Sequence, residues 1–124
     1  VDVRITTPYI PDKKLVHFCT RSHYRELVKA GVGIYEYTAG FIHPKTFVAD
    51  DRVATVGTVN MDFRSLYLHF ECGTWLYQSR AVKQVKDDYL ETLAHCKKIT
   101  EEDCRCNFIT RFIQDAVRIF APLI

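Results

Sequence analysis

Hydrophobic and polar positions change their spacing several times along the chain, and each change predicts a different element. Short runs rich in β-branched and aromatic residues, bounded by Gly, Pro or Asp, predict strands. Apolar residues that recur every three or four positions predict amphipathic helices. The predicted strands cover residues 3–7, 33–38, 43–50, 53–57 and 66–77.

Two amphipathic helices are predicted in the interior of the sequence. The first begins near Asp12, which can cap its start, and stops at Gly31, whose freedom at positive φ suits a helix C-terminus. The second begins after Ser79 and ends near Cys96. Because one helix separates the first two strands and another follows the last strand, we expect helices to pack on a sheet.

A last helix is predicted after the run 100–103, which is similar to a capping box, and it ends at Pro122. A stripe at helical spacing more often lies in a core than on a membrane, although Arg105, Arg111 and Arg118 lie nearby. We therefore expect its apolar face, like Trp75 and Tyr77, to be buried. The residues of this face are Phe108, Ile109, Phe112, Ile113, Val117 and Phe120.

The predicted element order is β-α-β-β-β-β-α-α, which indicates an α/β fold with a mixed sheet flanked by helices. The chain has 124 residues, of which 48% are hydrophobic and 26% charged, so it is long enough for one domain with a real core. This composition excludes a disordered or fibrous protein. We expect a single domain over residues 1–124.

Charge and cysteine content limit the kinds of partner and metal site that the chain can be expected to have. The net charge of +2 is too balanced to predict a nucleic-acid partner, and no apolar run is long enough to span a bilayer. The chain starts at Val1 without a signal-peptide pattern, so we expect a piece of a longer protein. Five scattered cysteines indicate mostly reduced thiols, and the spacing of Cys104 and Cys106 does not fit a zinc site.

The strongest chemical signal is the run His43-Pro44-Lys45 in the strand predicted over 43–50. Alternate side chains of a strand share a face, so His43 and Lys45 are expected to project together. An imidazole beside an ammonium suits phosphoryl chemistry, because the imidazole can attack phosphorus or transfer a proton while the ammonium holds phosphate oxygens. Asp50 has the opposite parity, and we expect it to support the site from behind.

Further polar residues follow at regular intervals. Gly57 allows close backbone approach, and Thr58 and Asn60 supply a hydroxyl and an amide that can contact phosphate. Glu71 stands in an apolar run, where a carboxylate needs a cationic or N–H partner. A histidine is the natural partner, because a carboxylate that accepts one ring N–H fixes the tautomer of the ring.

The joint spacing His43-x-Lys45-x4-Asp50-x6-Gly57-Thr58-x-Asn60 resembles the signature of the phospholipase D superfamily. The surrounding segments are similar to the C-terminal half of bacterial cardiolipin synthases over nearly the whole chain. One departure is Pro44, which stands where that family usually has Ala or Ser. Since proline cannot donate a ladder hydrogen bond, this position is expected at an edge or a bulge. The similar segments are 33–38, 40–43, 60–65, 68–72 and 121–124.

The resemblance implies a phospholipase D-like half-domain whose histidine meets that of a second half at one site. It implies that His43 is the general acid and base, with nucleophile as the alternative role, and that Glu71 orients it. It implies no cofactor and no metal. The remaining roles that it implies are phosphate binding by Lys45, Asn60 and Thr58, and support by Asp50, Ser65 and Arg64.

The same resemblance implies phosphatidyl transfer between two phosphatidylglycerol molecules, with cardiolipin and glycerol as products. The expected partners are the missing N-terminal half or a second copy of the chain, and a membrane surface, but not nucleic acid. The expected location is the bacterial cell membrane with the catalytic domain on the cytoplasmic side, this fragment itself being soluble. Two alternatives stay open: a homodimeric phosphodiesterase or nuclease with one signature per chain, and a non-catalytic module that binds anionic lipid.

Overall fold

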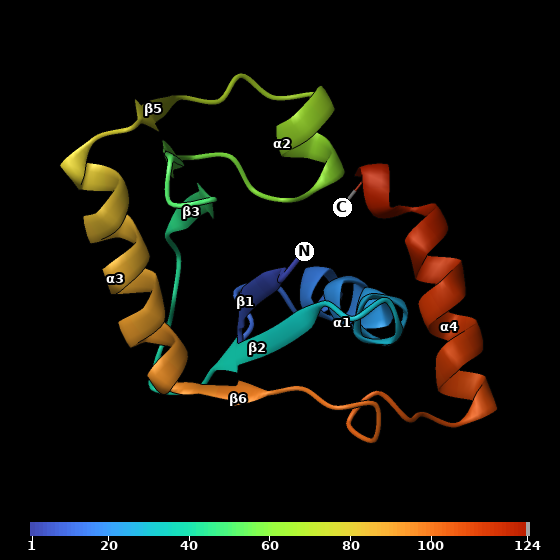
Figure 1. The fold of residues 1–124 in the computed structure, drawn as a ribbon. Coiled ribbons are helices and arrows are strands. Elements are labelled where there is room, and N and C mark those ends of the chain that lie inside the picture. Colours follow the sequence, from blue (N-terminus) through green and yellow to red (C-terminus); the bar gives the residue numbers. More distant parts are fainter. Residues whose placement is uncertain (124) are drawn as a thin grey trace. The chain divides into compact units, whose positions relative to one another are not determined.

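The computed structural model describes residues 1–123, which form both helices and strands (Figure 1). Two compact units are present: unit 1 joins Val1–Ile42 to the chain from His95 onward, and unit 2 is His43–Ala94. The elements are β1 (Arg4–Pro8), α1 (Lys14–Lys29), β2 (Gly33–Tyr37), β3 (Lys45–Ala49), β4 (Val53–Gly57), α2 (Phe63–Tyr67), β5 (Gly73–Tyr77), α3 (Arg80–Ala94), β6 (Cys96–Lys98), α4 (Phe108–Ile119) and the 3₁₀ turn η1 (Ala121–Leu123).

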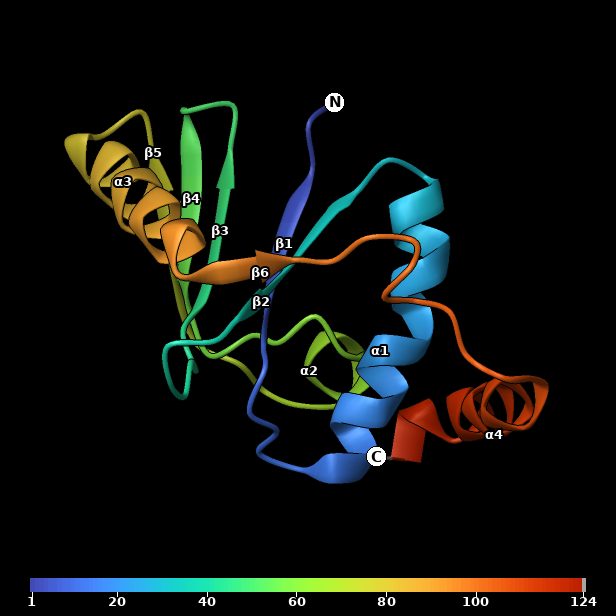
Figure 2. The same ribbon diagram turned by 90° about the horizontal axis from the view of Figure 1, so that it is seen from below.

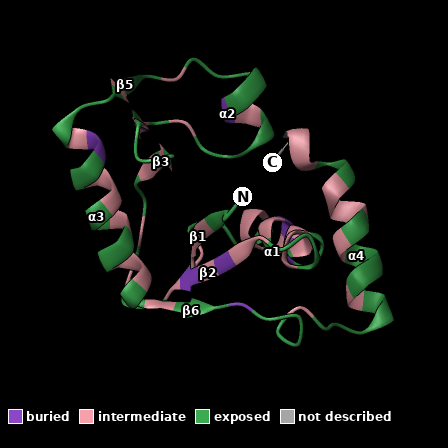
Figure 3. Cartoon of the chain, viewed as in Figure 1, coloured by how far each residue is buried: buried purple, intermediate pink, exposed green. Residues whose placement is uncertain are grey.

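Unit 1 is a β-α-β arrangement with an added strand. β1 and β2 are parallel from Arg4 opposite Gly33 to Pro8 opposite Tyr37, and β6 pairs antiparallel with β2. α1 connects the two parallel strands and packs on β2, as parallel strands require. Its apolar side forms the core with the sheet, so the most buried residues of this unit lie on α1, β2 and just after β6 (Figure 3). The core consists of Tyr24, Ile34 and Ile99, against which Ile5, Leu27, Val28, Val32 and Cys104 pack.

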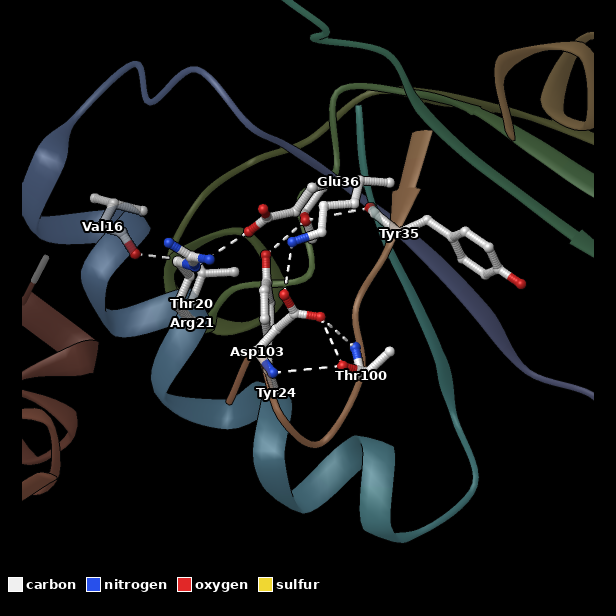
Figure 4. A network of polar contacts seen from close by, with 10 residues as sticks. Val16, Thr20, Arg21, Tyr24, Tyr35, Glu36, Thr100 and Asp103 are labelled. Atoms are coloured by element: carbon white, nitrogen blue, oxygen red, sulfur yellow. Dashed lines mark hydrogen bonds and ion pairs between the residues drawn. The ribbon is translucent and has the colours of Figure 1, made fainter. Parts of the chain in front are cut away.

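A buried carboxylate interrupts this apolar core. Glu36 on β2 is 1% exposed, and Arg21 of α1 places its Nε 3.1 Å from a carboxylate oxygen (Figure 4). A buried charge is costly unless a counter-ion is present, and this pair ties α1 to the sheet. No sequence pattern predicts this ion pair, because Arg21 and Glu36 lie fifteen positions apart on different elements.

Residues 100–103, which follow β6, form a turn and do not begin a helix. The carboxylate of Asp103 accepts hydrogen bonds from the backbone N–H of Thr100 at 2.9 Å and from its hydroxyl at 2.7 Å (Figure 4). Lys97 Nζ also lies 2.6 Å from the same carboxylate. The capping box predicted here therefore forms, but α4 begins only at Phe108, with Asn107 as its N-cap.

The Asp103 carboxylate is expected to make the chain acid-sensitive. Its hydrogen bond to Lys97, together with those from Thr100, holds the pKa of Asp103 well below its ordinary value. A lowered folded-state pKa contributes stability above the unfolded value, and this contribution is lost as the pH falls through the folded value. Urea denaturation between pH 5 and pH 2 should therefore show a smaller loss of unfolding free energy for Asp103→Asn than for the parent chain. The exposed Asp88→Asn variant is the control, and equal acid sensitivity of all three proteins would contradict this assignment.

α4 turns its polar side toward α1. Arg118 donates two hydrogen bonds to the Glu26 carboxylate of α1, at 2.8 and 2.9 Å. Five of the six residues of the apolar face that the sequence predicted to be buried are exposed, and Phe108 keeps 82% of its surface accessible. Val117 alone of these six is half-buried. That prediction was wrong for the described chain, because α4 contacts α1 through the charged Arg118.

Unit 2 is an antiparallel three-stranded sheet in the order β3-β4-β5. β3 and β4 form a hairpin whose turn residues Asp50 and Asp51 have φ of 51° and 56°. Three residues, 50–52, separate the paired Ala49 and Val53, and the Arg52 N–H donates a 3.1 Å hydrogen bond to the Ala49 carbonyl. Aspartate tolerates the left-handed conformation that this tight turn uses. Lys86 of α3 lies 2.6 Å from the Asp51 carboxylate and ties the helix to this turn.

One face of this sheet is covered by α3. Ala54 of β4 and Val82 of α3 are each fully buried, and α3 packs against all three strands. The alternate residues of the strands point to the opposite face. On that face Thr55 pairs with Phe47 on one side and with Trp75 on the other. Trp75 is 67% exposed and Tyr77 is also exposed, so their predicted place in a core is wrong.

The predicted α/β class is confirmed, but the order and the sheet differ from the prediction. The strands form two small sheets, and the extra elements α2 and β6 were not predicted. The strand predicted over 66–77 survives only as β5, because Asp62 caps a short helix immediately before it. α1 starts at Lys14 after Lys13, without the side-chain cap expected from Asp12. Within residues 1–123, no helix combines the length and apolar character needed to cross a bilayer.

Candidate functional site

The register of unit 2 gathers the predicted site residues at one end of its sheet. Lys45, Gly57 and Gly73 stand opposite one another in the row that closes this end. His43 precedes the row on the first strand, Thr58 follows it on the second, and Glu71 precedes it on the third. Antiparallel pairing alone therefore brings together residues that are up to twenty-eight positions apart in the sequence.

Gly57 is required where β4 meets the start of β5. A Cβ added at this position would lie 2.5 Å from the Cys72 carbonyl oxygen and 2.6 Å from the Gly73 Cα. Both neighbours are backbone atoms, so a side chain would push the strands apart. The close approach lets the Thr58 N–H donate a 2.9 Å hydrogen bond to the Cys72 carbonyl, which continues the pairing beyond the strand.

His43 and Lys45 are in direct contact. The Lys45 ammonium lies 2.7 Å from His43 Nε2 and donates a second hydrogen bond of 2.7 Å to the His43 carbonyl oxygen. Because an ammonium only donates, Nε2 is the acceptor here and the ring proton belongs on Nδ1. The structure therefore places Nε2 of His43 next to the Lys45 cation.

The backbone around this pair departs from the predicted strand. β3 begins at Lys45, so His43 and Pro44 lie just before it rather than inside it. Pro44 has no N–H for the ladder, and β3 is an edge strand, as the proline required. The two side chains nevertheless meet, since Lys45 folds back onto His43.

Glu71 is held by hydroxyl groups. The Thr58 hydroxyl donates a short hydrogen bond to Glu71 Oε2 and accepts a 3.0 Å bond from the Cys72 N–H. The Thr58 hydrogen bond, then that from Ser65, lowers the pKa of Glu71, with smaller contributions from the charges of His69 and Lys45. Glu71 is therefore a carboxylate near Lys45, and its predicted orientation of His43 remains a prediction.

A short helix carries the next group of site residues. The backbone N–H of Ser65 bonds to Asp62 Oδ1 at 2.7 Å, so Asp62 caps α2. Ser65 is buried, and its hydroxyl lies 3.4 Å from Asn60 Nδ2. Since Ser65 contributes to the lowered pKa of Glu71, it links Asn60 to the carboxylate.

The sequence patterns did not predict the cap of α2 or the contact between Arg64 and His69. The spacing of Asp62 and Ser65 is an N-cap signal that the aromatic run after it concealed. Arg64, predicted as a supporting residue, lies with its Nη2 3.1 Å from His69 Nε2. His69 thereby enters the surroundings of Glu71, although no motif had marked it.

Asp50 lies away from this group. It follows Ala49, which pairs with Val53 at the hairpin end of the sheet, whereas Lys45 pairs with Gly57 at the other end. The structure therefore does not bring Asp50 to the other predicted residues. Its predicted support of the site is confined to shaping the turn through its positive φ.

The chemistry available at the His43 end of the sheet is that of hydrogen bonding and proton transfer. Among residues 1–123, no group of three or more His, Cys, Asp or Glu side chains is arranged to hold a metal ion. Lys45 contacts the His43 imidazole, and Thr58 and Asn60, which follow β4, add neutral donors at this end of the sheet. Such donors suit an anionic substrate on which charge develops.

Comparison with known proteins points in the same direction. The family model described as cardiolipin synthase, PLD-like domain, matches residues 1–93. The chain is 39% identical to a cardiolipin synthase of Halalkalibacterium halodurans and 40% identical to one of Geobacillus kaustophilus, in each case over the whole chain and 25% of the relative. It is 45% identical to an uncharacterized protein of Streptococcus mutans, of which it covers 27%. The chain thus spans about a quarter of the length of these relatives. No solved structure matches it.

Proposed function

Because the chain belongs to the cardiolipin synthase family of PLD-like domains, we propose that it supplies one histidine–lysine half of a phosphatidyl-transfer site. In this proposal the intact parent protein moves the phosphatidyl group of one phosphatidylglycerol onto a second. Cardiolipin forms and glycerol is released. The observation that carries the proposal is the 2.7 Å contact between Lys45 Nζ and His43 Nε2.

His43 acts as the general acid and then the general base. A histidine of the other half attacks phosphorus and forms the P–N bond of a phosphohistidine, while the P–O bond to glycerol breaks. Protonated His43 donates its proton to the departing glycerol oxygen. The resulting neutral imidazole then removes the proton from the hydroxyl of the incoming phosphatidylglycerol, whose oxygen displaces the histidine.

Lys45 holds the phosphate while these bonds change. Its ammonium has three N–H donors, and His43 engages two of them, so one is available to a non-bridging phosphate oxygen. Asn60 and Thr58 supply neutral donors at the same end of the sheet. A phosphate ligand set of this kind, repeated in the other half, neutralises the transition state without a metal.

Glu71 positions its neighbours from beneath the site. Its hydrogen bond from Thr58 fixes the hydroxyl, and its contact with Ser65 holds α2 in place. In the proposed cycle the same carboxylate orients His43 when the imidazole becomes charged. Ser65 and Arg64 shape the surroundings and do not touch the substrate, and Asp50 shapes the hairpin turn at the other end of the sheet.

The other half of the site comes from outside this chain. The curated relatives are about four times as long as the chain, which leaves ample length for a second half-domain. We place the substrate at a membrane surface, because phosphatidylglycerol has to enter the site from a bilayer. The domain over residues 1–124 is thus one half of a two-signature enzyme.

The isolated chain is expected to be folded but inactive. One imidazole cannot serve as nucleophile and as leaving-group acid in the same step, so glycerol release from phosphatidylglycerol should stay at the blank rate. Enzyme-coupled glycerol detection with vesicles, combined with size-exclusion mass, checks this. Turnover by a monomer would contradict the two-half site. Turnover by a dimer would instead favour the arrangement with one signature per chain.

A further inference from the structure

Unit 1 contains a cavity of about 370 Å³ enclosed by α1, α4 and the segment before α4. The two helices lie side by side at this place (Figure 2). Six cationic and three acidic side chains line the cavity, an excess of positive charge in a chain that is nearly neutral. The cations are Arg21, Arg25, Lys29, Arg105, Arg111 and Arg118.

The spacing of the cations along both helices is regular. On α1 they recur every four residues, at positions 21, 25 and 29, and on α4 they are seven residues apart, at 111 and 118. Both intervals place side chains on one face of a helix. The two helices therefore present cationic stripes to the same space, an arrangement that repels itself unless an anion is bound.

The acids of the cavity do not neutralise these stripes. Glu26 is engaged by Arg118, and Asp103 is engaged by Lys97, which is not part of the lining. Asp115 is 4.0 Å from Arg118, and Arg21 is directed to the buried Glu36 (Figure 4). Four lining cations form no ion pair within residues 1–123, namely Arg25, Lys29, Arg105 and Arg111.

We propose that this cation-lined cavity binds a phosphate-bearing anion at a site that shares no residue with the His43 site. Guanidinium groups match phosphate oxygens with two parallel hydrogen bonds, and three of the four unpaired cations are arginines. The volume is within the range of small-ligand pockets and fits a phosphate ester. An adjoining hollow of about 430 Å³ is lined by Arg25, Lys29 and Arg105, with Glu101 as its acidic residue.

The phosphate group is either that of a phospholipid headgroup or that of a soluble ester, and one experiment separates the two. The 124-residue chain is mixed with vesicles of phosphatidylglycerol and phosphatidylcholine in equal amounts, with pure phosphatidylcholine vesicles, and with glycerol 3-phosphate. Co-sedimentation measures the first two and isothermal calorimetry the third. Binding to charged vesicles alone assigns the site to a lipid headgroup, and binding to glycerol 3-phosphate assigns it to a soluble ester.

Substitutions of the lining cations test whether the anion binds in this cavity. Arg25→Gln with Arg111→Gln removes two unpaired cations and leaves the Arg118–Glu26 pair intact, and it should weaken binding by about tenfold or more. Arg80→Gln with Lys83→Gln removes the same charge from α3 and should leave binding nearly unchanged. All of these variants are compared in a chain that also carries Lys45→Met, so that phosphate bound at the proposed His43 site does not contribute to the measurement.

Several results would overturn the proposal. These are absence of binding to both phosphate sources, an equal loss in the α3 control, or equal competition by polyglutamate. If the first double variant fails to fold by circular dichroism, Lys29→Gln with Arg105→Gln replaces it, since both residues are exposed. None of these readouts depends on phosphatidyl transfer, so the two proposals fail independently.

Discussion

Replacing His43 with asparagine in the intact parent protein is expected to lower phosphatidyl transfer by about a thousandfold or more, because proton transfer at the departing and incoming oxygens is lost. Asparagine keeps a polar side chain of similar reach but cannot carry a proton between the two steps. The loss should appear in kcat, since the imidazole acts on the transition state. Radiolabelled phosphatidylglycerol in mixed micelles, with cardiolipin as the counted product, provides the measurement.

A matched histidine controls for non-specific damage. His95 is exposed and lies in unit 1, so His95→Asn should keep the parent rate. If His43→Asn also keeps that rate, the chain is a non-catalytic module that only binds anionic lipid. The same substitution therefore decides between the two classes of function that the sequence left open.

The second large effect is expected at Lys45. Lys45→Met retains the aliphatic stem but removes both the cation beside His43 and the donor to the phosphate. Loss of one such electrostatic contact lowers kcat/KM by about 10²- to 10³-fold. Lys45→Arg should recover only part of this, because a planar guanidinium cannot reproduce the 2.7 Å contact with His43 Nε2 in the same geometry.

The distribution of this loss between kcat and KM is informative. Lys83→Met is the control, since the Lys83 side chain is exposed and pairs only across one helical turn with Asp87. A rise in KM with unchanged kcat would mean that Lys45 binds ground state and transition state equally. That result would contradict its assignment as the residue that stabilises developing charge.

The sequence predicted the elements with clear periodicity and missed those set by local caps. β4 coincides with its predicted range, and α1 and α3 lie within theirs. The strand predicted over 66–77 was wrong in its first half, because the Asp62 cap converts an aromatic run into α2. The buried face predicted for α4 was wrong because charged partners on α1, which periodicity does not reveal, decide how the helix docks.

For the site, the motif predicted which residues meet but not how. The structure brings His43 and Lys45 into contact, and the register explains why Thr58, Asn60 and Glu71 lie near the same end of the sheet. The motif by itself does not show that Asp50 lies at the hairpin end, which follows from the pairing of Ala49 with Val53. Nor could it reveal His69, whose place follows from the course of the loop after α2.

The central claim is that His43 moves protons while Lys45 holds the phosphate. A phosphatidyl ester of p-nitrophenol tests it, because this leaving group departs without a proton. In the intact parent protein, His43→Asn should release a burst of roughly one equivalent of p-nitrophenol per enzyme and then stall, since only the second step still needs a base. Lys45→Met should show no such rescue. If His43→Asn gives no burst, His43 is not the general acid and base, and the account is contradicted.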